Sequence, residues 1–190
     1  MTRLLSILLI LSISTISFAE NQNKQAYIDI ISIAPYMLED QLYLDLNAKI
    51  ILNQTQIEIL RNGIPLTFAL ETVFKRERLY FFNEILDENI RKFELSYHTL
   101  SNQYLITYTN INMVKSFPNL SLALDFMSNI SNIPIGSAGL IQPKIPKLKY
   151  LGLIKLGLDI NSLPTPMLIP AYFSKDWSLS TPWTSWEILL

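Results

Sequence analysis

The fold of this chain is decided by residues 41–52, which read Gln-Leu-Tyr-Leu-Asp-Leu-Asn-Ala-Lys-Ile-Ile-Leu. Apolar side chains occupy the even positions from Leu42 to Ile50. Because successive side chains of a strand point to opposite faces, this alternation predicts a strand that is buried on one face. The isoleucine-rich run 26–34 predicts a partner strand that ends at Pro35, since proline has no N–H to donate to a ladder. The two runs together predict a β-hairpin.

Two short helices are expected along the chain. Residues 55–61 can be capped by Asn53 or Thr55, and Gly63 fits the left-handed position after the last turn. A second helix is expected from Ser116 to Asn129, where apolar residues recur at helical spacing.

Further alternating or β-rich runs predict additional strands at 64–74, 79–82, 91–97, 103–109 and 150–160. A loop is expected over 133–146, and the prolines at 164, 166 and 170 are expected to break the chain before an aromatic tail, 177–188, that supplies a last strand or two. This pattern predicts a mainly β fold, an immunoglobulin-like antiparallel β-sandwich with one or two short helices. A closed barrel is the alternative.

Composition limits the classes of function. The 190 residues are 49% hydrophobic and 16% charged, as in an ordered chain that builds one core. A formal charge of -1 gives no field that would attract nucleic acid. The absence of cysteine excludes disulfides, thiol nucleophiles, zinc-thiolate sites and lipid-modified cysteines. No cofactor and no metal are expected.

The N-terminus has the pattern of an export signal. Arg3 precedes an apolar stretch from Leu4 to Ile13, and Ser17-Phe18-Ala19 places small residues where a signal peptidase cleaves. We expect a signal peptide at residues 1–19, a single β-sandwich domain at 20–190 and a periplasmic location. A retained membrane anchor is the alternative, although a spanning helix needs about 20 apolar residues.

Large aromatic residues gather near the C-terminus, where they form the candidate interaction site. Trp177, Trp183 and Trp186 are the three tryptophans of the chain, and Asp176 is a candidate acceptor for an indole N–H. Such rings can anchor a partner or a glycan. Alternatively, they close the sandwich by packing under its last strands.

Other motifs carry weaker signals. His98 is the only histidine, and no Gly-x-Ser-x-Gly signature accompanies it. The acid pairs Glu39-Asp40 and Asp87-Glu88 fit neither a glycosidase nor a calcium site and are expected to be solvated. A run of lysines is expected either to touch anionic lipid or to protect a sheet edge, and its members are Lys144, Lys147, Lys149 and Lys155.

The ending of the chain carries a family resemblance. Asp176-Trp177-Ser178-Leu179-Ser180, followed by Trp183-Thr184-Ser185-Trp186, resembles an uncharacterised family of exported proteins of gram-negative bacteria, domain of unknown function 4390. The stretches Gly63–Leu66 and Leu95–His98 resemble the same family. The resemblance implies a periplasmic domain without assigned activity, whose genes tend to lie beside a membrane sensor kinase of the nitrogen-regulation type.

These observations favour a non-enzymatic periplasmic interaction or accessory module. Its expected partner is an unknown envelope protein, with an inner-membrane sensor kinase as the candidate that the resemblance suggests, and with peripheral membrane contact. A periplasmic lipid or apolar-ligand binding protein is the alternative, motivated by a mean hydropathy of +0.25. A hydrolase that uses His98 is a third class.

Overall fold

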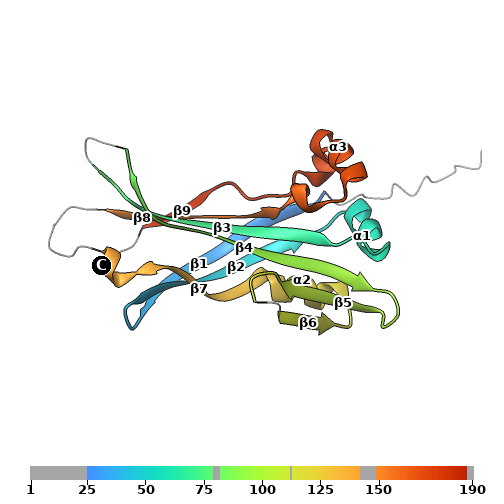
Figure 1. Ribbon diagram of the computed structural model, residues 1–190, viewed down its shortest axis with the longest axis horizontal. Coiled ribbons are helices and arrows are strands. Elements are labelled where there is room, and N and C mark those ends of the chain that lie inside the picture. The colour runs from blue at the N-terminus through green and yellow to red at the C-terminus, as the bar shows by residue number, and fades with distance from the viewer. Residues whose placement is uncertain (1–24, 79–81, 112, 142–148, 188–190) are drawn as a thin grey trace, which may run out of the picture.

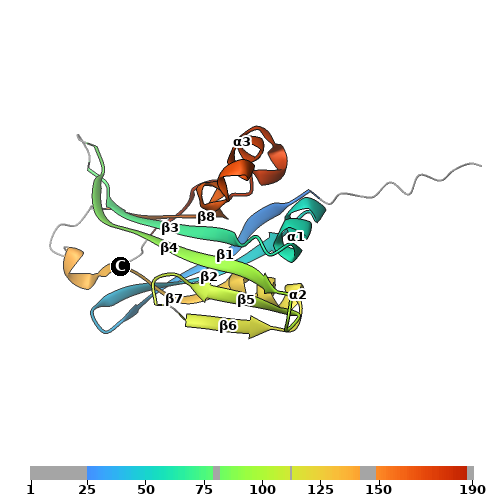
Figure 2. The same cartoon turned by 45° about the vertical axis from the view of Figure 1, so that its right-hand side comes forward.

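The computed structural model describes residues 25–78, 82–111, 113–141 and 149–187. The predicted signal peptide at 1–19 lies outside these ranges, as do Lys144, Lys147 and residues 79–81 of the expected strand 79–82. The described chain is mainly β and forms two antiparallel sheets. In Figures 1 and 2 the strands of both sheets run along the long axis of the molecule.

The smaller sheet has the strand order β1-β2-β7. β1 (Tyr27–Leu38) and β2 (Gln41–Ile51) form the predicted hairpin. β7 (Asn129–Ser137) pairs with the other side of β2. The even-numbered side chains of β2 are all buried, as its alternation predicts.

The larger sheet has the strand order β6-β5-β4-β3-β8-β9. Four successive strands form the meander: β3 (Leu66–Arg76), β4 (Glu84–His98), β5 (Gln103–Tyr108) and β6 (Met113–Phe117). The chain then contributes β7 to the smaller sheet and returns as β8 (Tyr150–Leu158), which pairs with the free side of β3. The short β9 (Thr184–Glu187) pairs with β8.

Both predicted helices are confirmed, although the second begins four residues later than expected, because Ser116 and Phe117 belong to β6. α1 (Gln54–Arg61) begins with a capping box, in which the Asn53 side chain accepts from the backbone N–H of Gln56 and the Gln56 side chain accepts from that of Asn53. Gly63 follows at φ 84°, a left-handed conformation that suits glycine. α2 (Leu120–Ser128) is capped by Asn119. The described chain also contains three short 3-10 turns: η1 (Ala138–Leu140), η2 (Ile160–Ser162) and η3 (Lys175–Trp177).

One cluster of buried apolar side chains joins the two sheets and the helices. Its largest fully buried members include Leu44, Leu60, Phe68, Phe74, Leu95, Ile106, Ile133 and Ile154. Burying a side chain of this size stabilises the fold by roughly 1.5–3 kcal/mol. The predicted mainly β class with two antiparallel sheets is therefore confirmed. The immunoglobulin-like arrangement stays a prediction, since sheets of three and six strands differ from the four and three of an immunoglobulin constant domain.

Two expectations about prolines in strands are wrong. β1 does not end at Pro35 but continues to Leu38, and the expected loop 133–146 begins with five residues of β7, which contains Pro134. Both strands are edges of the smaller sheet. An edge strand has one side without a partner, and proline is tolerated there because no ladder hydrogen bond is lost.

A third helix contradicts the expected break at the prolines. α3 (Thr165–Phe173) contains Pro166 in its first turn and Pro170 further along. Proline is favourable in the first turn because the N–H there has no helical acceptor. The described chain thus has three α-helices where one or two were expected. None of its helices is long and apolar enough to cross a membrane.

Candidate functional site

The candidate site is built around the segment between β8 and the end of β9, which contains all of the predicted interaction residues. Backbone hydrogen bonds fasten this segment to the sheet: the N–H of Leu158 donates to Leu179 O at 2.7 Å, and the N–H of Thr181 donates to Leu156 O at 2.8 Å. Ser180 lies over Gly157, where an added Cβ would come within 2.7 Å of the Ser180 side chain. The glycine therefore permits the close backbone approach that glycines inside a strand predict.

Asp176 acts through its backbone. Its carbonyl oxygen accepts from Gln56 Nε2 at 2.7 Å and from Asn53 Nδ2 at 3.3 Å. Gln56 and Asn53 are the buried capping residues of α1, so this carbonyl satisfies amide groups that would otherwise be costly to bury. The Asp176 side chain is exposed and takes no part in this contact. The expected role of Asp176 as a carboxylate acceptor for an indole is not what its position supports.

The three tryptophans have different surroundings. Trp177 is 6% exposed and belongs to the core. Trp186 packs against the core from β9, and its ring occupies the space above Gly152, where an added Cβ would lie 2.1 Å from the indole. Its Nε1 is buried and has no hydrogen-bond partner among the described residues. These two rings pack under the last strands of the sandwich, which agrees with the alternative interpretation of the aromatic tail.

Trp183 is the tryptophan that reaches the surface. It is 45% exposed, and Lys155 Nζ lies 5.7 Å from its ring centroid. Lys155 also lies 3.6 Å from a carboxylate oxygen of Glu71. Trp183 therefore stays a candidate contact residue, while Trp177 and Trp186 have little surface to offer a partner.

The lysine run does not protect a sheet edge in the described residues. β8 lies between β3 and β9, so Lys155 is on an interior strand. Lys149 is exposed just before β8, where its carbonyl oxygen accepts from Glu77 N. The expected edge position is wrong because sequence alternation does not reveal which strands pair on either side.

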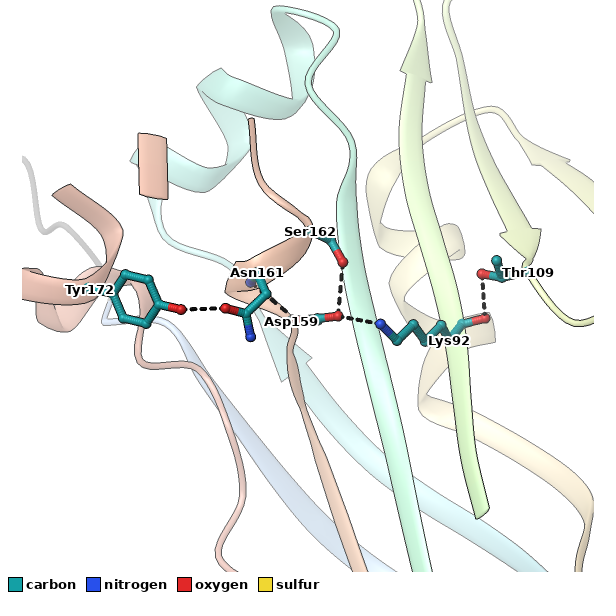
Figure 3. A network of polar contacts seen from close by, with 6 residues as sticks. All are labelled: Lys92, Thr109, Asp159, Asn161, Ser162 and Tyr172. Atoms are coloured by element: carbon teal, nitrogen blue, oxygen red, sulfur yellow. Dashed lines mark hydrogen bonds and ion pairs between the residues drawn. The ribbon is translucent and has the colours of Figure 1, made fainter. Parts of the chain in front are cut away.

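A polar network that the sequence did not predict connects the larger sheet to α3. Figure 3 shows Lys92 of β4 reaching across β3 to Asp159, which follows β8. Lys92 Nζ lies 2.7 Å from Asp159 Oδ2, and Ser162 Oγ donates to the same oxygen at 2.9 Å. Asn161 N donates to Asp159 Oδ1, and the Tyr172 hydroxyl of α3 donates to Asn161 Oδ1. The network thus holds η2 and α3 against the sheet.

Two opposing effects set the pKa of Asp159. Burial, the largest single effect, raises it, but the hydrogen bonds from Lys92, Ser162 and the Asn161 backbone together with the Lys92 charge outweigh burial. The pKa of Asp159 therefore lies below its usual value, and the carboxylate is ionised at neutral pH.

The network supports an exposed apolar helix face. Ile169 is 72% exposed, Tyr172 58% and Phe173 89%. The spacing of three and four residues places them along one side of α3, and residues 165–173 include no charged side chain. Figure 1 shows α3 projecting from the body of the two sheets. We call Ile169, Tyr172 and Phe173 the α3 face.

The weaker sequence candidates lie apart from this face. His98 ends β4 at an exposed turn, where its Nδ1 lies 2.9 Å from Ser101 Oγ and accepts from Ser101 N at 3.3 Å. This contact closes the β4–β5 turn. Among the described residues, no three histidine, aspartate or glutamate side chains lie close enough together to hold a metal ion.

Comparison with known proteins agrees with the sequence resemblance. The family model described as Domain of unknown function (DUF4390) matches residues 25–187, which cover both sheets, α3 and the aromatic tail. No curated protein and no solved structure matches the chain. With most of its length matched, this chain belongs to the DUF4390 family.

Proposed function

We propose that this protein is a non-enzymatic accessory module of the periplasm that acts by contact with an inner-membrane protein, and that the α3 face is its contact surface. The observation that carries this proposal is the exposure of three large apolar side chains on one short helix. Exposed apolar clusters on soluble domains are characteristic of protein or membrane contacts.

The fixed position of α3 supports a contact role. The Tyr172 hydroxyl is bonded to Asn161, and Asp159 ties the adjoining turn to Lys92. Ala171, on the other side of the helix, is buried in the core. A contact surface that is already ordered loses less conformational entropy on binding than a mobile one.

α3 lies at the end of the sheets where β1 begins, close to α1, as both views show (Figures 1 and 2). The inner membrane as the place of contact rests on the predicted export signal and on the family resemblance. Within this proposal, a sensor kinase is the partner that the family resemblance suggests.

Site-specific photocrosslinking in the intact cell envelope tests the proposal. A photoreactive amino acid is placed at Phe173 in one strain and at Leu100 in another. Leu100 is the matched control, because it is an equally exposed apolar residue, in the turn between β4 and β5. We expect a discrete inner-membrane protein to be crosslinked from position 173, not from 100, and to be lost when Ile169→Asp is added.

Each outcome has a defined meaning. A sensor kinase in the product supports the full proposal, and a different inner-membrane protein keeps the contact but removes the kinase. Equal products from both positions, or none from 173, overturn the α3 face as the contact. Turnover of a substrate by the purified protein, abolished by one side-chain change, would overturn the non-enzymatic role.

A further inference from the structure

Arg91 of β4 is a charged residue on the inner face of the larger sheet, and neither the packing of the sandwich nor the α3 face accounts for its position. It lies opposite Leu70 of β3 in the strand register, and Leu70 is 1% exposed in the core. Paired residues of neighbouring strands point to the same face of a sheet. Arg91 therefore extends toward the space between the sheets, on the face that Phe93 and Leu95 share.

The guanidinium of Arg91 is partly desolvated, and its counter-charge is absent from the described residues. No carboxylate, carbonyl or hydroxyl of the described residues forms a hydrogen bond or ion pair with its side chain, in contrast to the paired Arg76, Arg78, Lys92 and Lys155. Burial lowers the pKa of Arg91, and no neighbouring group offsets that effect. Arginine nevertheless stays protonated, so β4 holds a partly buried positive charge without a partner in the part of the chain that the structure describes.

A pocket of about 290 Å³ lies beside this charge. Its wall is mostly apolar and consists of Phe93, Tyr108, Ile111 and Ile130, with the amides of Asn89 and Asn110 at its polar part. The Phe93 and Tyr108 rings pack edge to face with centroids 5.2 Å apart, which fixes one wall. An apolar cavity of about 150 Å³ is enough to take up benzene, so this pocket has room for a ring or a short acyl chain.

We propose that this pocket binds a monoanionic amphiphile, a carboxylate that carries an apolar chain, with the carboxylate on Arg91. The single charge argues for a monoanion: Lys92 also borders the pocket, but its Nζ is paired with Asp159. The planar guanidinium matches a carboxylate through two parallel hydrogen bonds. The apolar wall accepts the chain, which an inorganic anion does not have. The pocket is separate from the α3 face, and its occupancy goes beyond the proposed contact function.

Isothermal titration of the mature protein, residues 20–190, with decanoate below its micellar concentration tests this inference. Decanol supplies the chain without the charge, and acetate supplies the charge without the chain. We expect saturable one-to-one binding of decanoate at least tenfold tighter than that of decanol, and no measurable binding of acetate. Decanol that binds as tightly as decanoate would overturn the role of Arg91 as the anion partner.

Two arginine variants localise the binding. Arg91→Gln should weaken decanoate binding at least tenfold, whereas Arg61→Gln, a change at an exposed arginine of α1, should leave it unchanged. Unchanged binding to Arg91→Gln, or no saturable binding to the wild type, overturns the inference. If Arg91→Gln does not fold, Arg91→Lys and the methyl ester of decanoate on the wild type replace it, and both are expected to show the same loss. Photocrosslinking at Phe173 reports on the contact function independently, so failure of one proposal leaves the other standing.

Discussion

Trp186 lies directly over Gly152, so that the indole ring of β9 occupies the space that a side chain at position 152 of β8 would need. An added Cβ would lie 2.1 Å from the ring, far inside van der Waals contact. On the other sheet, Gly136 of β7 makes a similar approach to Phe74, whose ring would come within 3.0 Å of an added Cβ. Phe74 of the core and Trp186, which packs against the core, therefore each depend on a glycine opposite the ring.

Gly152→Ala should destabilise the protein, because the ring or one of the two strands must move. Overpacking of this kind typically costs about 1–3 kcal/mol of unfolding free energy. Urea denaturation followed by tryptophan fluorescence measures the loss. Gly139→Ala is the matched control, since its Cβ would meet only Ser137 Oγ at an ordinary 3.5 Å. Equal stability of the two variants would contradict the close contact.

Gln56→Ala should cost more than a typical helix substitution. The change removes half of the capping box, which leaves the N–H of the buried Asn53 without its acceptor, and it leaves the Asp176 carbonyl with only the longer hydrogen bond from Asn53 Nδ2. We expect a loss of about 2 kcal/mol or more. Gln54→Ala on the same helix is the control, because the exposed Gln54 amide forms a hydrogen bond only with Glu58. This variant should lose only about 0.5 kcal/mol of unfolding free energy. Thermal and urea unfolding of both variants measures the two losses of unfolding free energy.

Asp159 should contribute a pH-dependent part of the stability. Its pKa is lowered in the folded state, so its contribution is present above the unfolded pKa, about 3.9, and is lost as the pH falls through the folded pKa. Asp159→Asn should therefore be less stable than the wild type at pH 7, and the difference in unfolding free energy between the two proteins should be smaller at pH 3. Urea denaturation at both values measures it, with the exposed Asp176→Asn as control. A gap that is the same at both pH values would contradict the assignment.

Trp177→Ala and Trp183→Ala should separate structural from surface tryptophans. Trp177 is buried in the core, where truncation of a large aromatic costs about 3–5 kcal/mol. Trp183 loses only a surface contact with Lys155, worth about 0.5–1 kcal/mol. Unfolding free energies test this difference. Affinity capture from a crosslinked envelope then tests whether Trp183→Ala, which should remain folded, loses a partner that the wild type retains.

The alternation of residues 41–52 was sufficient to predict β2, its buried face and its hairpin, since the period of side chains along a strand is a local property. α1 and α2 were predictable for the same reason, α1 from its cap at Asn53 and from Gly63, and α2 from the helical spacing of its apolar residues. β7 and α3 were missed because the tolerance of Pro134 and Pro170 depends on neighbours that the local sequence does not reveal.

The candidate site was less accessible to sequence reasoning. The three tryptophans lie within ten residues of one another in the sequence, yet one is buried, one is packed over a glycine and one is at the surface. Their difference arises from the pairing of β9 with β8, which is a tertiary property. Arg91 also gave no signal, because the lack of a counter-charge is visible only when the surroundings of the side chain are known.

The place of β8 in the larger sheet has a consequence for the order of folding. β3 pairs on one side with β4, which follows it directly, and on the other with β8, which is synthesised some seventy residues later. As the chain grows from its N-terminus, β3 through β6 can assemble early, but an apolar strand edge stays open until residues 150–158 are available. Edges of this kind pair readily with other chains. A nascent or truncated chain that ends before β8 should therefore depend on a chaperone to avoid aggregation, whereas the complete chain should not.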